Sequence, residues 1–157
     1  MKTDWNEIVI AVEARAQGRC EYCRMHQALQ GATFHVEHIR PRSRGGSLGL
    51  DNLAWCCPSC NLHKSDRVEA PDPDSGRMTP LFNPRAQNWR EHFYWDRFRL
   101  MARTPTGRAT LQATQAAQSY GCGVLGLHLG RFGLRNKAGG FEHDLVRKFI
   151  RVSGALL

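Results

Sequence analysis

The sequence has no long hydrophobic run and no signal-peptide pattern at its start. No stretch of about 18 apolar residues interrupts the 157-residue chain, so we expect no membrane-spanning helix. Without a signal peptide, an oxidising compartment is not indicated, and we expect a cytoplasmic protein with reduced thiols. Internal repeats are also absent, and the length fits one domain with an appendage at most.

Lysine is scarce among the basic residues. Of the 22 basic side chains, 18 are arginine and 4 are lysine, and the formal net charge is +8. A guanidinium group can bind two phosphate oxygens at once, whereas a lysine ammonium acts as a point charge. This balance favours a polyanionic partner such as DNA or RNA, with a basic but inert surface as the alternative.

Two Cys-x-x-Cys pairs suggest a metal site. Cys20 and Cys23 form the first pair, and Cys57 and Cys60 form the second. Zinc prefers four ligands in a tetrahedron, and two such pairs supply four thiolates, so we expect a structural zinc ion. Because Cys56 is next to Cys57, a choice of register is needed, and we assign Cys57 to the metal and Cys56 to a buried strand. Disulfides or plain buried thiols are the alternative.

The segment between and after these pairs resembles the HNH endonuclease family, whose fold is the ββα-metal or His-Me finger. The resemblance covers residues 20–66 and extends loosely to about residue 110. The elements that carry it follow in family order: Glu37-His38-Ile39-Arg40-Pro41, Gly45-Gly46, Asn52-Leu53 and Cys57-Pro58-Ser59-Cys60-Asn61-Leu62-His63-Lys64. The third family position is Asn61 and not a histidine, so the chain carries an H-N-N variant of the pattern.

Hydrolysis of a phosphodiester needs an activated water, a cation at the phosphate and donors for its oxygens. His38 suits the general base, since its ordinary pKa of about 6.5 allows a neutral imidazole. Glu37 and Asn61 suit the ligands of a hard divalent cation, Mg²⁺ or Mn²⁺. The resemblance implies that Asn52 braces the loop that orients His38. Lys64 lies three residues after Asn61 on one helical face and is a candidate phosphate ligand.

Other side chains near the motif each have two possible roles. Glu37 and His38 are adjacent, so their side chains point to opposite faces of a regular strand. Both side chains can serve one site only if the strand breaks at these residues. His35 and His63 are further candidate metal ligands, and imidazole ligands would favour a softer metal than magnesium. Alternatively, both histidines are structural. Arg40, Arg42 and Arg44 alternate along a loop that is suited to a nucleic acid backbone or is simply solvated.

The predicted fold class is α+β, a ββα-metal core stapled by zinc with flanking helices. We expect strands at 31–38 and 53–57 and a helix at 58–66, with Pro58 in its first turn. An earlier helix at 4–17 has Asp4 as its cap and one apolar face, formed by Trp5, Ile8, Val12 and Ala16. We divide the chain into a nuclease domain at 1–110, with a finger core at 20–66, and an extension at 111–157, which includes an amphipathic helix at 141–152.

These observations favour a metal-dependent HNH endonuclease that acts on DNA, most simply double-stranded DNA. The alternative is a zinc-stabilised module that binds nucleic acid without cleaving it. A binding module would not need Glu37, His38, Asn52, Asn61 and Lys64 together, which favours the enzyme. The sequence indicates neither the base specificity nor the oligomeric state.

Overall fold

A computed structural model describes residues 4–97 and 99–116. Short helices and three two-stranded antiparallel sheets make up this part of the chain, which confirms the predicted α+β class. In order the elements are α1 (Trp5–Ala16), β1 (His35–His38), β2 (Leu53–Cys56), α2 (Pro58–Lys64), β3 (Glu69–Pro71), β4 (Met78–Pro80), α3 (Trp89–His92), β5 (Phe93–Asp96), β6 (Arg99–Ala102) and α4 (Pro105–Thr114). Three 3₁₀ turns lie at Gln27–Leu29, Arg42–Arg44 and Leu50–Asn52.

The predicted ββα finger is present. β1 pairs antiparallel with β2, so that Glu37 faces Ala54 across the ladder and His38 faces Leu53. α2 follows β2 at once, because Pro58 occupies the first helical turn and the Cys57 sulfur accepts a hydrogen bond from the Cys60 amide. The first strand is shorter than predicted, since it begins at His35.

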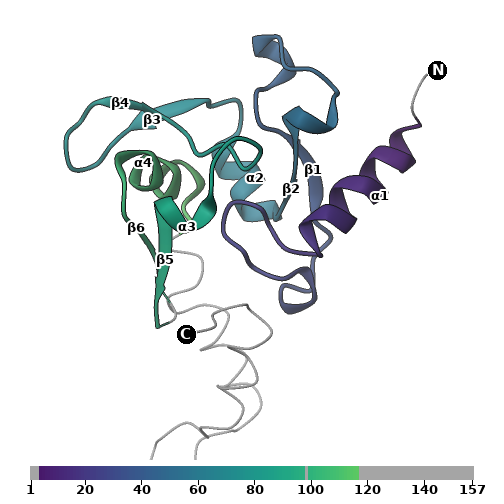
Figure 1. The fold of residues 1–157 in the computed structure, drawn as a ribbon, viewed down its shortest axis with the longest axis horizontal. Coiled ribbons are helices and arrows are strands. Elements are labelled where there is room, and N and C mark those ends of the chain that lie inside the picture. The colour runs from purple at the N-terminus through teal and green to yellow at the C-terminus, as the bar shows by residue number, and fades with distance from the viewer. Residues whose placement is uncertain (1–3, 98, 117–157) are drawn as a thin grey trace, which may run out of the picture.

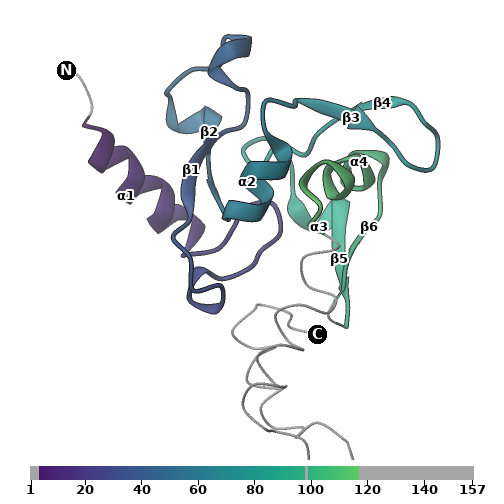
Figure 2. The ribbon, with the colours of Figure 1, turned by 180° about the vertical axis from the view of Figure 1, so that it is seen from behind.

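The predicted N-terminal helix is α1, and the Asp4 side chain caps it by accepting a hydrogen bond from the Asn6 amide. The helix packs on β2 and buries Ile8, Val12 and Ala16. The prediction that Trp5 shares this buried face is wrong, since 46% of Trp5 is exposed. Figures 1 and 2 show the reason: the first turn of α1 extends beyond the rest of the finger.

Glu21, between the first two cysteines, covers the edge of β2. Its amide donates to the Trp55 carbonyl (2.8 Å), and its carboxylate accepts from the Trp55 amide (2.9 Å). The same carboxylate forms ion pairs with Arg15 of α1 and with Arg85, which lies 64 residues further along the chain. A single buried carboxylate therefore ties α1, β2 and the segment after β4 together.

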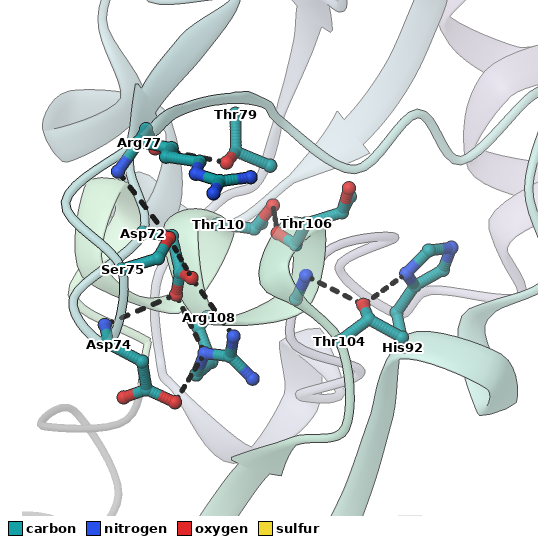
Figure 3. A network of polar contacts seen from close by, with 11 residues as sticks. Asp72, Asp74, Ser75, Arg77, Thr79, His92, Thr104, Thr106, Arg108 and Thr110 are labelled. Atoms are coloured by element: carbon teal, nitrogen blue, oxygen red, sulfur yellow. Dashed lines mark hydrogen bonds and ion pairs between the residues drawn. The ribbon is translucent and has the colours of Figure 1, made fainter.

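The second half of the described chain packs on the outer side of α2. α4 contacts α2, β3, β4 and β6. Arg108 of α4 bonds both carboxylate oxygens of Asp72 in the β3–β4 turn, at 2.6 and 2.9 Å, and Thr104 caps α4 through the Gly107 amide (Figure 3). α2 is therefore held between the β1–β2 hairpin and α4, as both ribbon views show (Figures 1 and 2).

α4 continues to Thr114, four residues past the predicted domain boundary at 110. The division at residue 110 stays a prediction. Most of the predicted extension, including the helix at 141–152, lies outside the described residues. Among the helices that the structure describes, none has the length and apolar character needed to cross a membrane.

Candidate active site

Four cysteine sulfurs gather at the base of the finger. The Sγ atoms of Cys20, Cys23, Cys57 and Cys60 all lie within 4.8 Å of one another, and all four residues are buried. The Cys23 and Cys57 sulfurs are 3.8 Å apart, which matches the edge of a tetrahedron with zinc–sulfur bonds of about 2.3 Å. The donor set therefore fits a structural metal such as zinc. Cys56 is buried at the end of β2 and is not part of the cluster, as predicted.

A buried carboxylate lies next to this cluster. The Tyr22 hydroxyl donates to Glu37 Oε2 (2.9 Å), and the Lys64 ammonium donates to Glu37 Oε1 (2.5 Å). Glu37 is 6% exposed and Lys64 is 1% exposed. Burial raises the pKa of Glu37 above its ordinary value, and the charge of Lys64 opposes that rise. The Lys64 ammonium also donates to the His38 carbonyl oxygen (3.3 Å), so it bridges Glu37 and the end of β1.

His38 is half-buried, and its Nε2 atom is buried without a hydrogen-bond partner among the described residues. Its pKa is lowered, mainly by burial and further by the positive charges of Arg42 and Lys64. The imidazole is therefore neutral near pH 7, and a buried nitrogen without a partner can accept a proton. β1 is regular through both Glu37 and His38 and ends directly after His38, so the strand has no break between these two residues.

Asn52 closes the loop that follows His38. Its side-chain oxygen accepts from the Arg40 amide (2.8 Å), and its side-chain nitrogen donates to the carbonyls of Arg40 (3.0 Å) and Ser47 (2.9 Å). Gly46 packs against the same Arg40 backbone: a Cβ atom at Gly46 would be 1.8 Å from the Arg40 carbonyl oxygen. The loop therefore depends on both the Asn52 amide group and the absence of a side chain at Gly46.

The sequence model of the HNH endonuclease family matches residues 20–67, the segment that contains the cysteine cluster, Glu37, His38 and Asn52. Residues 20–67 form an HNH domain. The match of this segment to the family suggests nuclease activity. Comparisons with curated proteins and with solved structures gave no match.

The other predicted site residues of the HNH domain have different surroundings. Asn61 precedes Lys64 by almost one helical turn, and its side chain has no hydrogen-bond partner within the described residues. His63 turns back on its own helix, with Nδ1 2.8 Å from the Ser59 carbonyl oxygen. His35 is exposed at the opposite end of β1 from His38. The structure therefore does not bring His35 or His63 to the Glu37–Lys64 pair.

The predicted basic loop is exposed. Arg40, Arg42 and Arg44 are all open to solvent, and Arg40 Nε donates to the Arg44 carbonyl oxygen (2.7 Å). Lys64 differs from this group, because its ammonium is buried against Glu37.

Sequence reasoning missed Glu21 and Tyr22. Both lie inside the first Cys-x-x-Cys pair, and both reach away from the cluster: Glu21 to Arg85 and Tyr22 to Glu37. The available signal was a carboxylate and a phenol placed between two buried ligands, where each polar group needs a partner.

Proposed function

We propose that the protein is a metal-dependent endonuclease that hydrolyses phosphodiester bonds in DNA, with His38 as the general base. The observation that carries this proposal is the buried, unpartnered Nε2 atom of a neutral His38, next to the Glu37–Lys64 pair of an HNH domain. In this role His38 takes a proton from the attacking water as the water oxygen bonds to phosphorus, while the bond from phosphorus to the leaving sugar oxygen breaks and that oxygen takes a proton from solvent.

Glu37 and Asn61 are the proposed ligands of a divalent cation, Mg²⁺ or Mn²⁺. Two observations fit this assignment. A carboxylate has about four lone-pair positions, so Glu37 retains acceptor capacity beside Tyr22 and Lys64. The Asn61 amide has no partner among the described residues. When bound, the cation supplies charge stabilisation at the leaving oxygen.

The remaining residues prepare the site. Tyr22 and Lys64 fix the orientation of the Glu37 carboxylate, and the charge of Lys64 opposes the rise in the Glu37 pKa that burial causes. The Asn52 side chain holds the backbone of Arg40 and so fixes the path of the chain directly after His38. The exposed guanidinium groups of Arg40, Arg42 and Arg44 are suited to the phosphates on either side of the cleaved bond.

A second candidate function is binding of nucleic acid without cleavage. The basic loop and a zinc-stabilised finger are sufficient for this function, and Lys64 already satisfies the charge of Glu37. The unpartnered His38 nitrogen favours the enzyme, because a binding module gains nothing from a buried polar atom that lacks a partner.

Plasmid cleavage by the full-length protein tests the proposal. The reactions contain Mg²⁺, Mn²⁺ or EDTA, and zinc content is measured before and after each one. We expect cation-dependent nicking that is lost in His38→Ala and Asn61→Ala and kept in the matched control His35→Ala, whose side chain is exposed on the same strand. Binding of DNA without cleavage under any of the cations, with zinc retained, would support the binding module instead.

A further inference from the structure

A cavity of about 680 Å³ opens beside the proposed active site. One wall comes from the HNH domain and includes Ile39 and Arg40, which directly follow His38, together with Lys64. The opposite wall comes from residues 80–87, the segment between β4 and α3 that crosses near α2 in Figure 1. We call this cavity the Arg40–Ala86 groove, and it shares Lys64 with the Glu37 pair.

The far wall of the Arg40–Ala86 groove is fixed in place. The Leu81 amide donates to the Val68 carbonyl (2.9 Å), and the Phe82 amide donates to Thr110 Oγ1 of α4 (2.8 Å). Further along the segment, Arg85 forms an ion pair with Glu21. Because these bonds run to three separate parts of the molecule, the groove exists before any ligand arrives, as is usual for small-molecule sites.

The lining combines three kinds of chemistry. Arg40 and Arg44 supply positive charge at the finger side, whereas Lys64 reaches the lining with its charge paired with Glu37. Val68, Pro80 and Ala86 supply the accessible apolar surface of the other walls, in front of the buried Leu81 and Phe82. Two side-chain amides come from the half-buried Asn83 and the exposed Gln87; their oxygens accept from the Arg85 and Asn83 backbone amides, which leaves their NH₂ groups to donate. This combination matches a nucleotide, which has an anionic phosphate, an apolar sugar and base face, and a base edge that forms hydrogen bonds.

The apolar wall also indicates the state of that nucleotide. In a duplex the base faces are stacked on one another, and the backbone offers phosphates and sugars to a protein. A groove that was built for intact duplex backbone would need positive charge and no apolar wall. Its volume lies within the range of about 300–1,000 Å³ that is typical of sites for single small ligands.

We propose that the Arg40–Ala86 groove binds one unstacked nucleotide of the substrate strand, adjacent to the cleaved phosphodiester. This inference rests on the proposed nuclease function. It predicts that the protein prefers DNA with an unpaired nucleotide, such as a bulge, a mismatch or a single-stranded end, over a fully paired duplex. Unpairing a base costs a few kcal/mol, and a substrate that is already unpaired avoids this cost.

Binding measurements without cleavage test the inference. The probes are thymidine 3′,5′-bisphosphate, a fully paired short duplex, and the same duplex with one bulged thymidine, each titrated in calcium with the zinc-loaded protein. Ala86→Trp fills the groove from its exposed far wall, and Ala14→Trp places the same ring on the exposed side of α1 as a matched control. Gln87→Glu, which adds negative charge to the same wall, serves as a second variant if Ala86→Trp lowers zinc content or changes the circular dichroism spectrum.

We expect the wild type and Ala14→Trp to bind the bisphosphate and to prefer the bulged duplex. Ala86→Trp and Gln87→Glu should bind the bisphosphate about tenfold more weakly and should lose the preference, as expected for the loss of one base contact. Equal binding of both duplexes by the wild type would show that the groove holds ordinary duplex backbone and would overturn the inference. Undetectable bisphosphate binding by the wild type, or unchanged bisphosphate binding by Ala86→Trp and Gln87→Glu, would also overturn the inference. Groove-dependent binding without plasmid cleavage would instead refute the nuclease and leave the groove assignment standing.

Discussion

Replacing Lys64 with methionine should strongly destabilise the protein. Lys64 and Glu37 are 1% and 6% exposed, and their charged atoms are 2.5 Å apart. Methionine fills a similar volume but leaves the Glu37 carboxylate buried without its cation. Removal of one partner from a buried ion pair costs about 3–5 kcal/mol, whereas exposed pairs contribute about 1 kcal/mol or less. For a domain with an unfolding free energy of about 5–15 kcal/mol, the expected loss is a large fraction of the total.

The assay is urea unfolding followed by tryptophan fluorescence, with zinc retained and no other divalent cation added. The double variant Glu37→Gln/Lys64→Met should recover most of the lost stability, because it removes the unpaired charge together with its partner. Asp74→Asn is the control, since Asp74 is 66% exposed in its pair with Arg108 and should change stability little.

The pH dependence of the unfolding free energy of Lys64→Met is a second test of the buried ion pair. Burial already raises the pKa of Glu37, and loss of the Lys64 charge raises it further. A folded-state pKa above the unfolded value means that the folded protein holds the proton more tightly, so stability falls as pH rises from about 4.3 upward. The variant should therefore be closest to the wild type at low pH. A decrease in unfolding free energy below about 1 kcal/mol at pH 7, or a decrease that does not depend on pH, would refute the stabilising role of the buried ion pair.

Three further predictions test other parts of the structure. Cys57→Ser should lower zinc content and abolish cooperative unfolding, whereas its neighbour variant Cys56→Ser should keep zinc, as measured by metal analysis. Gly46→Ala should displace the Arg40 backbone and lower DNA cleavage with zinc content unchanged; cleavage at the wild-type rate would show that the loop tolerates a side chain. Asp72→Asn should lower the Tm at pH 7, because Arg108 holds the pKa of Asp72 well below its ordinary range; the difference should shrink as pH falls below about 4, and a difference that persists in acid would contradict the ion pair.

The finger could be predicted from sequence because its signals are local. The spacing of the cysteines, Pro58 after a short apolar strand and the Asn52-Leu53 step each act within a few residues, and the structure has β2, α2 and the cysteine cluster where these signals place them. The exposure of Trp5 could not be predicted, because periodicity shows which residues share a helical face but not how far the partner surface extends.

The buried polar contacts were harder to predict for a different reason. Lys64 lies on the face of α2 that the sequence indicated, but helical spacing does not show whether that face meets solvent or a buried carboxylate. The partner of Glu21 is 64 residues away, and no periodic pattern links such positions. The Glu21–Arg85 contact depends on the path of the chain after residue 67, which the family resemblance covers only loosely.

The contacts of Glu21 with Trp55 also affect solubility. A two-stranded ribbon has two edges, and an uncovered strand edge offers free amide and carbonyl groups to a second chain, which is a common route to aggregation and strand exchange. Glu21 forms hydrogen bonds with both the amide and the carbonyl of Trp55 on β2, and the cysteines on either side of Glu21 and Tyr22 hold Glu21 in this position. The cysteine pair that places Glu21 therefore also keeps one edge of the sheet from pairing with another molecule.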